Sequence, residues 1–191
     1  MNTPNKLTVL RIILIPVYIV FLMVDISPID NYIATVVFII ASLTDLLDGK
    51  IARKRNLVTD FGKFADPLAD KLLTCSAFIC FVELGMMPAW VAIIIVAREL
   101  AVSGFRLILA GKGVVLAAAM SGKIKTTLQM VYIIIATLNG AAMFNWMGLS
   151  SGTLGVYNTI TIILMYVVLV LTVVSMIEMF YKNRKGFSTD I

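Results

Sequence analysis

Four aspartates in a largely apolar part of the chain have the residue type and the spacing for chemistry. Asp45 and Asp48 lie three residues apart, and Asp66 and Asp70 lie four apart. Residues at these spacings share one face of an α-helix, so each pair is predicted to project from one side of its helix. The chain contains no histidine, which excludes a histidine-dependent nucleophile and a histidine-ligated zinc site. Any chemistry must therefore use carboxylates, cations, hydroxyls or a cofactor.

Carboxylates gathered in an apolar setting such as a membrane interior repel one another. Placing each one near the centre of a bilayer costs about 2.5 to 3.5 kcal/mol of insertion free energy. The nearest cations that can offset them are Arg53 and Lys71. Hard divalent cations prefer oxygen ligands, and a set without histidine or thiolate favours Mg²⁺ or Mn²⁺. Two such ions held by shared carboxylates can clamp a phosphoryl group for in-line displacement. Gly49 and Gly62 leave room for a bulky ligand, whose phosphates Arg53 can reach.

The same residues also fit a structural role. Buried ion pairs would hold two helices together, and the glycines would permit close approach, as in membrane helix interfaces rich in small residues. This alternative explains the glycines but leaves at least two carboxylates unpaired. Arg98 beside Glu99, together with Arg106, Lys123 and Lys125, can likewise simply extend to the cytoplasmic membrane surface.

The elements that carry these residues are predicted to be membrane-spanning helices. The 191 residues are 60% hydrophobic and only 14% charged, whereas roughly a quarter of the residues in soluble domains are charged. A span needs about 20 apolar residues, and six stretches qualify: 7–24, 31–47, 64–84, 88–110, 126–146 and 157–181. We therefore expect an all-α polytopic membrane protein with six transmembrane helices. It forms a single domain over residues 1–191, with a short interfacial N-terminus over 1–6 and a frayed tail over 186–191.

Lys and Arg residues set the predicted orientation. They occupy both termini and the second and fourth connections, whereas the first, third and fifth connections contain none. The positive-inside rule therefore places both termini and the acidic cluster on the cytoplasmic side of the cell membrane. The net charge of +5 then reflects this orientation and contact with anionic membrane lipids, and no nucleic-acid partner is expected.

Two local features refine the helix boundaries. Pro67 disfavours helical geometry at Asp66, so the third helix is expected to begin or kink there, with Asp60 in a solvated loop. The segment from Val114 to Met120 is apolar but only seven residues long. It is too short to span, so we expect it to lie in the interface or to re-enter the membrane.

The acidic stretch resembles the full signature of the CDP-alcohol phosphatidyltransferases, with no departure in spacing. It reads Asp45-x-x-Asp48-Gly49-x-x-Ala52-Arg53, then eight residues, then Gly62-x-x-x-Asp66-x-x-x-Asp70. The resemblance implies a six-helix fold, usually a homodimer, whose four motif aspartates bind two divalent metals. It also implies that Asp70 acts as general base. The residues implied to contact CDP-diacylglycerol are Asp48, Gly49, Ala52, Arg53 and Gly62.

Three further stretches resemble the bacterial phosphatidylglycerophosphate synthases: PNKLTVLRIILIP near the N-terminus, AREL and SGFR between Arg98 and Arg106, and GKIKTTLQM from Gly122 to Met130. This likeness implies transfer of a phosphatidyl group from CDP-diacylglycerol to glycerol 3-phosphate, with release of CMP. The acceptor phosphate needs cations. The candidates are Arg106, Lys123 and Lys125, followed by Arg98, Arg11 and Thr8.

Two alternatives stay open at this point. The same chemistry suits another acceptor, such as inositol, inositol phosphate, serine or glycerol. A different class, an ion-coupled or proton-coupled transporter, also uses intramembrane acids. A transport path should place polar groups at several depths, whereas the polar groups here cluster on one side.

Overall fold

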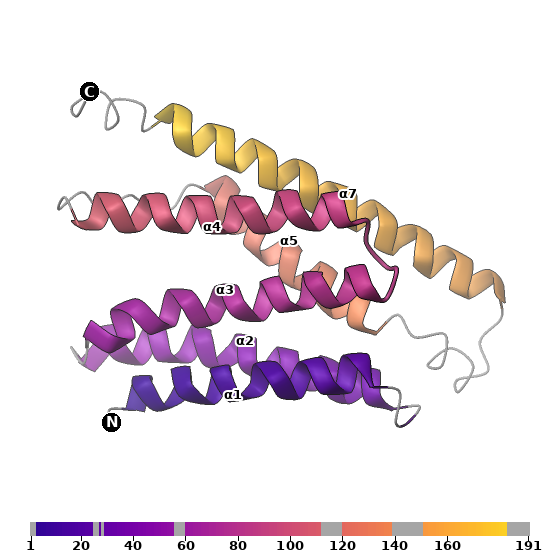
Figure 1. The fold of residues 1–191 in the computed structure, drawn as a ribbon, viewed down its shortest axis with the longest axis horizontal. Coiled ribbons are helices and arrows are strands. Elements are labelled where there is room, and N and C mark those ends of the chain that lie inside the picture. Colours follow the sequence, from indigo (N-terminus) through magenta and orange to yellow (C-terminus); the bar gives the residue numbers. More distant parts are fainter. Residues whose placement is uncertain are drawn as a thin grey trace.

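The computed structural model describes an all-helical chain over residues 3–24, 27, 29–55, 60–111, 120–138 and 151–182. For residues 3–6, 45–55, 60–67, 70, 110–111 and 151 it describes the backbone alone. Successive helices run in alternating directions (Figure 1). The six helices of the described residues are α1 (Thr3–Met23), α2 (Asp30–Arg55), α3 (Asp60–Glu83), α4 (Ala89–Gly111), α5 (Met120–Thr137) and α7 (Ser151–Lys182).

The prediction of an all-α chain is confirmed, and each of the six predicted stretches overlaps one helix. α1 begins at Thr3, so the helix extends into the predicted interfacial N-terminus. α5 begins at Met120, the last residue of the predicted re-entrant segment, and ends at Thr137. The remainder of that segment, residues 139–146 of the fifth predicted stretch and the predicted frayed tail all lie outside the described residues.

The third helix begins earlier than Pro67 suggests. α3 starts at Asp60, so Asp60 is helical and the helix continues through Asp66 and Pro67. A proline inside a helix removes one backbone hydrogen bond, but membrane helices tolerate this because neighbouring groups satisfy the freed carbonyl. α1 likewise contains Pro16 inside the helix.

Helices α1, α2 and α3 form one side of the bundle, and α5 packs against α7 on the other (Figure 1). The aromatic core joins the two sides. The ring of Tyr132 in α5 stacks on Phe78, with centroids 6.2 Å apart, and meets Phe81 edge-on at 5.9 Å. The Tyr18 hydroxyl in α1 lies 3.0 Å from Thr137 Oγ1 in α5. These contacts set the position of α5 relative to α1 and α3.

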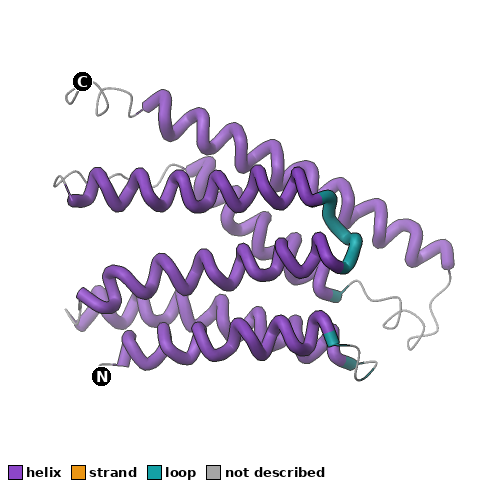
Figure 2. The backbone as a smooth tube through the Cα atoms, in the orientation of Figure 1, coloured by secondary structure: helices purple, strands orange, loops and turns teal. Residues whose placement is uncertain are grey.

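A tight turn joins α3 to α4 (Figure 2). Gly85 adopts a left-handed conformation with φ of 69°. The Met86 amide donates to the Phe81 carbonyl at 2.9 Å, and the Gly85 amide donates to the Val82 carbonyl at 3.1 Å. This pair of bonds is the Schellman arrangement that ends a helix. The sharp reversal brings α4 back beside α3.

Among the described residues, one stretch, Gly152–Lys182 in α7, has both the length and the apolar composition to cross a membrane. Its mean hydropathy is 2.8. Shorter apolar stretches occupy Leu7–Met23 and Asp30–Thr44. α4 is long enough to span but carries three charged residues, Arg98, Glu99 and Arg106.

Candidate active site

The two helices that carry the four aspartates are neighbours. α2 is helical through Asp45 and Asp48, and α3 is helical through Asp66 and Asp70. The C-terminal end of α2 and the N-terminal end of α3 lie at the same end of the bundle (Figure 1), and the two helices contact one another. The structure therefore gives each aspartate pair the helical spacing that the sequence predicted.

The aspartate side chains themselves lie outside the described residues, so their meeting at one point stays a prediction. The same holds for the other predicted CDP-diacylglycerol contacts, Gly49, Ala52, Arg53 and Gly62. Among the side chains that the structure does describe, no three His, Cys, Asp or Glu residues form a group that can hold a metal ion.

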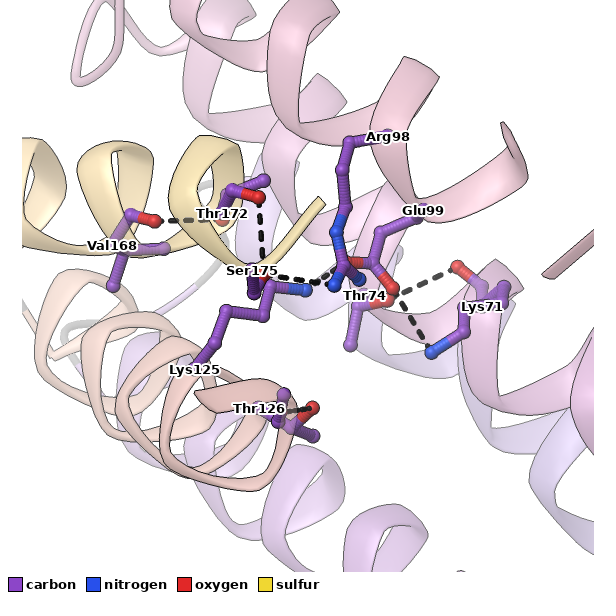
Figure 3. Close-up of polar contacts among 10 residues, drawn as sticks. Lys71, Thr74, Arg98, Glu99, Lys125, Thr126, Val168, Thr172 and Ser175 are labelled. Atoms are coloured by element: carbon purple, nitrogen blue, oxygen red, sulfur yellow. Dashed lines mark hydrogen bonds and ion pairs between the residues drawn. The ribbon is translucent and has the colours of Figure 1, made fainter. Parts of the chain in front are cut away.

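A buried carboxylate at Glu99 in α4 gathers cations from three helices (Figure 3). Only 2% of Glu99 is exposed. Its Oε2 atom lies 3.0 Å from Nζ of Lys71 in α3. Its Oε1 atom lies 3.2 Å from Nη1 of Arg98 and forms a second ion pair with Nζ of Lys125 in α5. One carboxylate thus links α3, α4 and α5.

Arg98 extends this network to α7. Its Nη2 atom donates to the Ser175 hydroxyl at 2.9 Å, and that hydroxyl donates to the Thr172 carbonyl at 3.1 Å. The Thr172 hydroxyl in turn donates to the Val168 carbonyl at 2.6 Å (Figure 3). The planar guanidinium of Arg98 binds Glu99 and Ser175 at the same time. A lysine ammonium could not reproduce this two-sided geometry.

Among the side chains that the structure describes, the network contains three cations, Lys71, Arg98 and Lys125, around one carboxylate, Glu99. Charges buried away from water are costly unless they are paired. Glu99 therefore serves as a shared counter-charge for groups on three helices.

A cavity of about 330 Å³ lies beside this network. Its walls supply four cations, one carboxylate and three hydroxyls, which suit a small anion that also carries hydroxyl groups. The lining residues are Lys71, Arg98, Glu99, Val102, Ser103, Arg106, Gly122, Lys123, Thr126 and Thr127. We call this space the cationic cavity.

The cationic cavity brings together three of the predicted acceptor-phosphate residues. Arg106 and Lys123 are exposed along its wall, and Arg98 lines it while being only 8% exposed. Lys125 is 1% exposed, does not line the cavity and pairs with Glu99. Its ammonium therefore supports the cavity wall from behind.

The other two predicted acceptor residues lie elsewhere. Thr8 and Arg11 are buried in α1, and Arg11 Nε donates to the Ala41 carbonyl of α2 at 3.3 Å. Ala41 precedes Asp45 by one helical turn. The structure therefore places Arg11 between α1 and α2, near the acidic motif, and away from the cationic cavity.

The sequence did not identify Glu99 as the centre of this network. It suggested Lys71 as a counter-charge for the aspartates, and the structure shows that Lys71 also pairs with Glu99. One signal was available: Arg98 and Glu99 interrupt an apolar stretch, and ionisable groups inside a membrane commonly mark a functional site. Their partners on α3 and α5 depend on how the helices pack.

Comparison with known proteins gives a consistent result. The family model described as CDP-alcohol phosphatidyltransferase matches residues 1–181. The chain is similar to a CDP-diacylglycerol–glycerol-3-phosphate 3-phosphatidyltransferase of Bacillus subtilis, with 41% identity over 99% of this chain and 98% of that protein. A protein of the same name from Haemophilus influenzae is 36% identical over 99% of this chain and 96% of its own length. A third, from Rickettsia bellii, is 42% identical over 72% of this chain and 75% of its own length.

Proposed function

The chain belongs to the CDP-alcohol phosphatidyltransferase family, and on this premise we propose that it makes phosphatidylglycerophosphate. It transfers a phosphatidyl group from CDP-diacylglycerol to glycerol 3-phosphate and releases CMP. The observation that carries the choice of acceptor is the cationic cavity, whose four cations and three hydroxyls suit a small phosphorylated polyol. Relatives that match the chain over almost its full length carry the name of this activity.

The cationic cavity receives glycerol 3-phosphate. Arg106 and Lys123 bind the phosphate at the exposed wall, because a dianion there gains charge-assisted hydrogen bonds. The hydroxyls of Thr126 and Thr127 donate to the carbonyls of Gly122 and Lys123 at 2.9 and 3.1 Å. Their oxygen atoms thus keep lone pairs that accept hydrogen bonds from the hydroxyls of the acceptor.

The acidic motif receives the CDP end of the lipid substrate. The family is generally dependent on divalent metals, and we assign two ions, Mg²⁺ or Mn²⁺, to Asp45, Asp48, Asp66 and Asp70. The all-oxygen donor set, spaced on the adjacent helices α2 and α3, fits these hard cations. When bound, they supply charge stabilisation at the pyrophosphate.

Asp70 accepts the proton of the attacking hydroxyl as general base. It directly precedes Lys71 in α3, and Lys71 lines the cationic cavity. The backbone of Asp70 therefore lies next to a residue of the proposed acceptor site, which supports this assignment. The acceptor oxygen forms a bond to the lipid-linked phosphorus, the bond to the CMP oxygen breaks, and the proton passes to Asp70. Asp48, Gly49, Ala52, Arg53 and Gly62 hold the CDP group.

The enzyme works within the cell membrane. We propose that the chain forms a single domain whose six helices all span the bilayer, with both termini and the active site on the cytoplasmic side. Two such chains form a homodimer. The long apolar part of α7, Gly152–Lys182, supports this placement. So does the gathering of the N-terminal end of α1, the C-terminal end of α7 and the acidic ends of α2 and α3 at one end of the bundle (Figure 1).

The test measures CMP release by purified protein with CDP-diacylglycerol, Mg²⁺ and a panel of acceptors. We expect release with glycerol 3-phosphate and much less with inositol, inositol phosphate, serine or glycerol. Asp70→Asn should abolish it. The matched control is Asp30→Asn at the opposite end of α2, where the carboxylate accepts from the Ser27 amide at 2.6 Å and asparagine can replace it. Absence of release, or equal release by Asp70→Asn, would contradict the proposal.

A further inference from the structure

Glu99 links the cationic cavity to the residue that follows Asp70 of the acidic motif. Its carboxylate pairs with Lys71, the residue after Asp70 in α3, and with Arg98, which lines the cationic cavity. It also pairs with Lys125 behind the cavity wall. Glu99 lines the cationic cavity but is only 2% exposed, so its carboxylate is occupied mainly by these partners.

The three cations differ in how free they are to move. Lys125 and Arg98 are buried, whereas the Lys71 side chain is 23% exposed. If the carboxylate were neutral, Lys71, Arg98 and Lys125 would each lose this shared counter-charge. Lys71 is the one of the three that can turn toward solvent in response, because its side chain already reaches it.

The ion pair is one of the contacts that hold α3 against α4. α3 packs more extensively on α1 than on α4, and the Lys71–Glu99 ion pair, 3.0 Å long, crosses the smaller of these two interfaces. A release of Lys71 would therefore weaken the attachment of the Asp70 segment of α3 to α4. It would also remove one cation from the wall of the cationic cavity.

We propose that Glu99 is a positioning residue that acts through Lys71: it holds the Asp70 segment of α3 in register with the acceptor bound in the cationic cavity. This inference rests on the proposed function and adds a residue to it. Glu99 does not touch the reacting atoms. Its removal should therefore affect the use of the acceptor far more than the binding of CDP-diacylglycerol.

A purely structural role for Glu99 would give a different experimental result. If Glu99 served only to neutralise the buried Lys125, then removing both charges together would restore the protein completely. The pair Glu99→Gln with Lys125→Met removes one negative and one positive charge and leaves the net charge of the network unchanged. This double variant separates folding from positioning, even if Glu99→Gln alone fails to fold.

The experiment compares kcat/KM for glycerol 3-phosphate, KM for CDP-diacylglycerol and Tm among the wild type, Lys125→Met and the double variant. We expect the double variant to keep the Tm of Lys125→Met and its KM for CDP-diacylglycerol within about twofold. Its kcat/KM for the acceptor should fall at least about tenfold below that of Lys125→Met, equivalent to about 1.4 kcal/mol. Lys71→Met should reproduce this loss. The matched control is Glu83→Gln, since Glu83 is exposed at the end of α3 opposite to Asp70 and its change should leave both substrates unaffected.

Two results would overturn the inference: acceptor kinetics of the double variant equal to those of Lys125→Met, or a Lys71→Met variant that uses the acceptor like the wild type. Equal losses for both substrates would also overturn it, because they would indicate a general loss of structure. A wild-type protein that releases CMP only with a different acceptor would instead refute the proposed function. The two failures are therefore distinct.

Discussion

Replacing Arg106 by methionine should weaken the use of glycerol 3-phosphate and spare the lipid substrate. Arg106 lines the exposed wall of the cationic cavity together with Lys123. Methionine keeps much of the side-chain volume but removes the charge. Since we assign CDP-diacylglycerol to the acidic motif of α2 and α3, its KM should change little.

The magnitude follows from the exposure of Arg106. Two unit charges 4 Å apart interact by about 1 kcal/mol in water and by about 4 kcal/mol at an effective dielectric constant of 20. Because Arg106 is exposed, the lower value applies, and a phosphate with nearly two negative charges doubles it. Allowing for the mobility of an exposed side chain, we expect a loss of about 1 to 2 kcal/mol, which is about 5-fold to 30-fold in acceptor KM.

The assay measures CMP release while glycerol 3-phosphate is varied at saturating CDP-diacylglycerol, at low and at high salt. The wild-type KM should rise with salt, and the KM of Arg106→Met should rise less because one screened interaction is gone. Lys182→Met is the matched control, since Lys182 is exposed in α7 and pairs with Glu178. An unchanged acceptor KM, or an equal rise in KM for both substrates, would refute the reasoning.

Three further perturbations test the fold and the metal requirement. Tyr18→Phe removes the hydrogen bond to Thr137 and should cost about 1 kcal/mol of stability, seen as a lower Tm in detergent. Tyr166→Phe, at an exposed tyrosine, should leave the Tm unchanged. Equal Tm values for the two variants would contradict a stabilising role of the Tyr18 hydroxyl. In Gly85→Ala the added Cβ atom meets no atom within 4 Å, so the loss in free energy of unfolding comes from backbone strain at φ 69° and should be about 1 to 2 kcal/mol. An unchanged Tm would show that the turn relaxes. Excess EDTA should stop CMP release, and Mg²⁺ or Mn²⁺ should restore it; full activity in EDTA would exclude the assigned ions.

Local patterns in the sequence predicted most of the fold. Long apolar stretches identify helices because a backbone in lipid must satisfy its own hydrogen bonds, and every predicted stretch overlaps a helix of the structure. One helix boundary was not predicted correctly. Pro67 indicated a third helix that begins or kinks near Asp66, with Asp60 in a loop, yet α3 begins at Asp60. A helix in a bundle tolerates an internal proline where neighbouring groups satisfy the freed carbonyl.

The proposed acceptor site was only partly predictable. Arg98, Arg106 and Lys123 were singled out as cations and line one cavity. Lys125 has the same residue type and lies two positions from Lys123, but it faces inward to Glu99. Residues two apart on a helix point in different directions, so the start of α5 at Met120 and its packing decide which lysine reaches the cavity.

The sequence by itself determined the helices, the family and the spacing of the motif aspartates, because these depend on local composition and on the period of an α-helix. Only the tertiary structure decided the partners of the buried charges. Glu99 meets Lys71 and Lys125, which are 28 and 26 residues away in the chain, and through Arg98 it reaches Ser175. Such pairings depend on which helix faces pack together, and no periodicity within one helix specifies that choice.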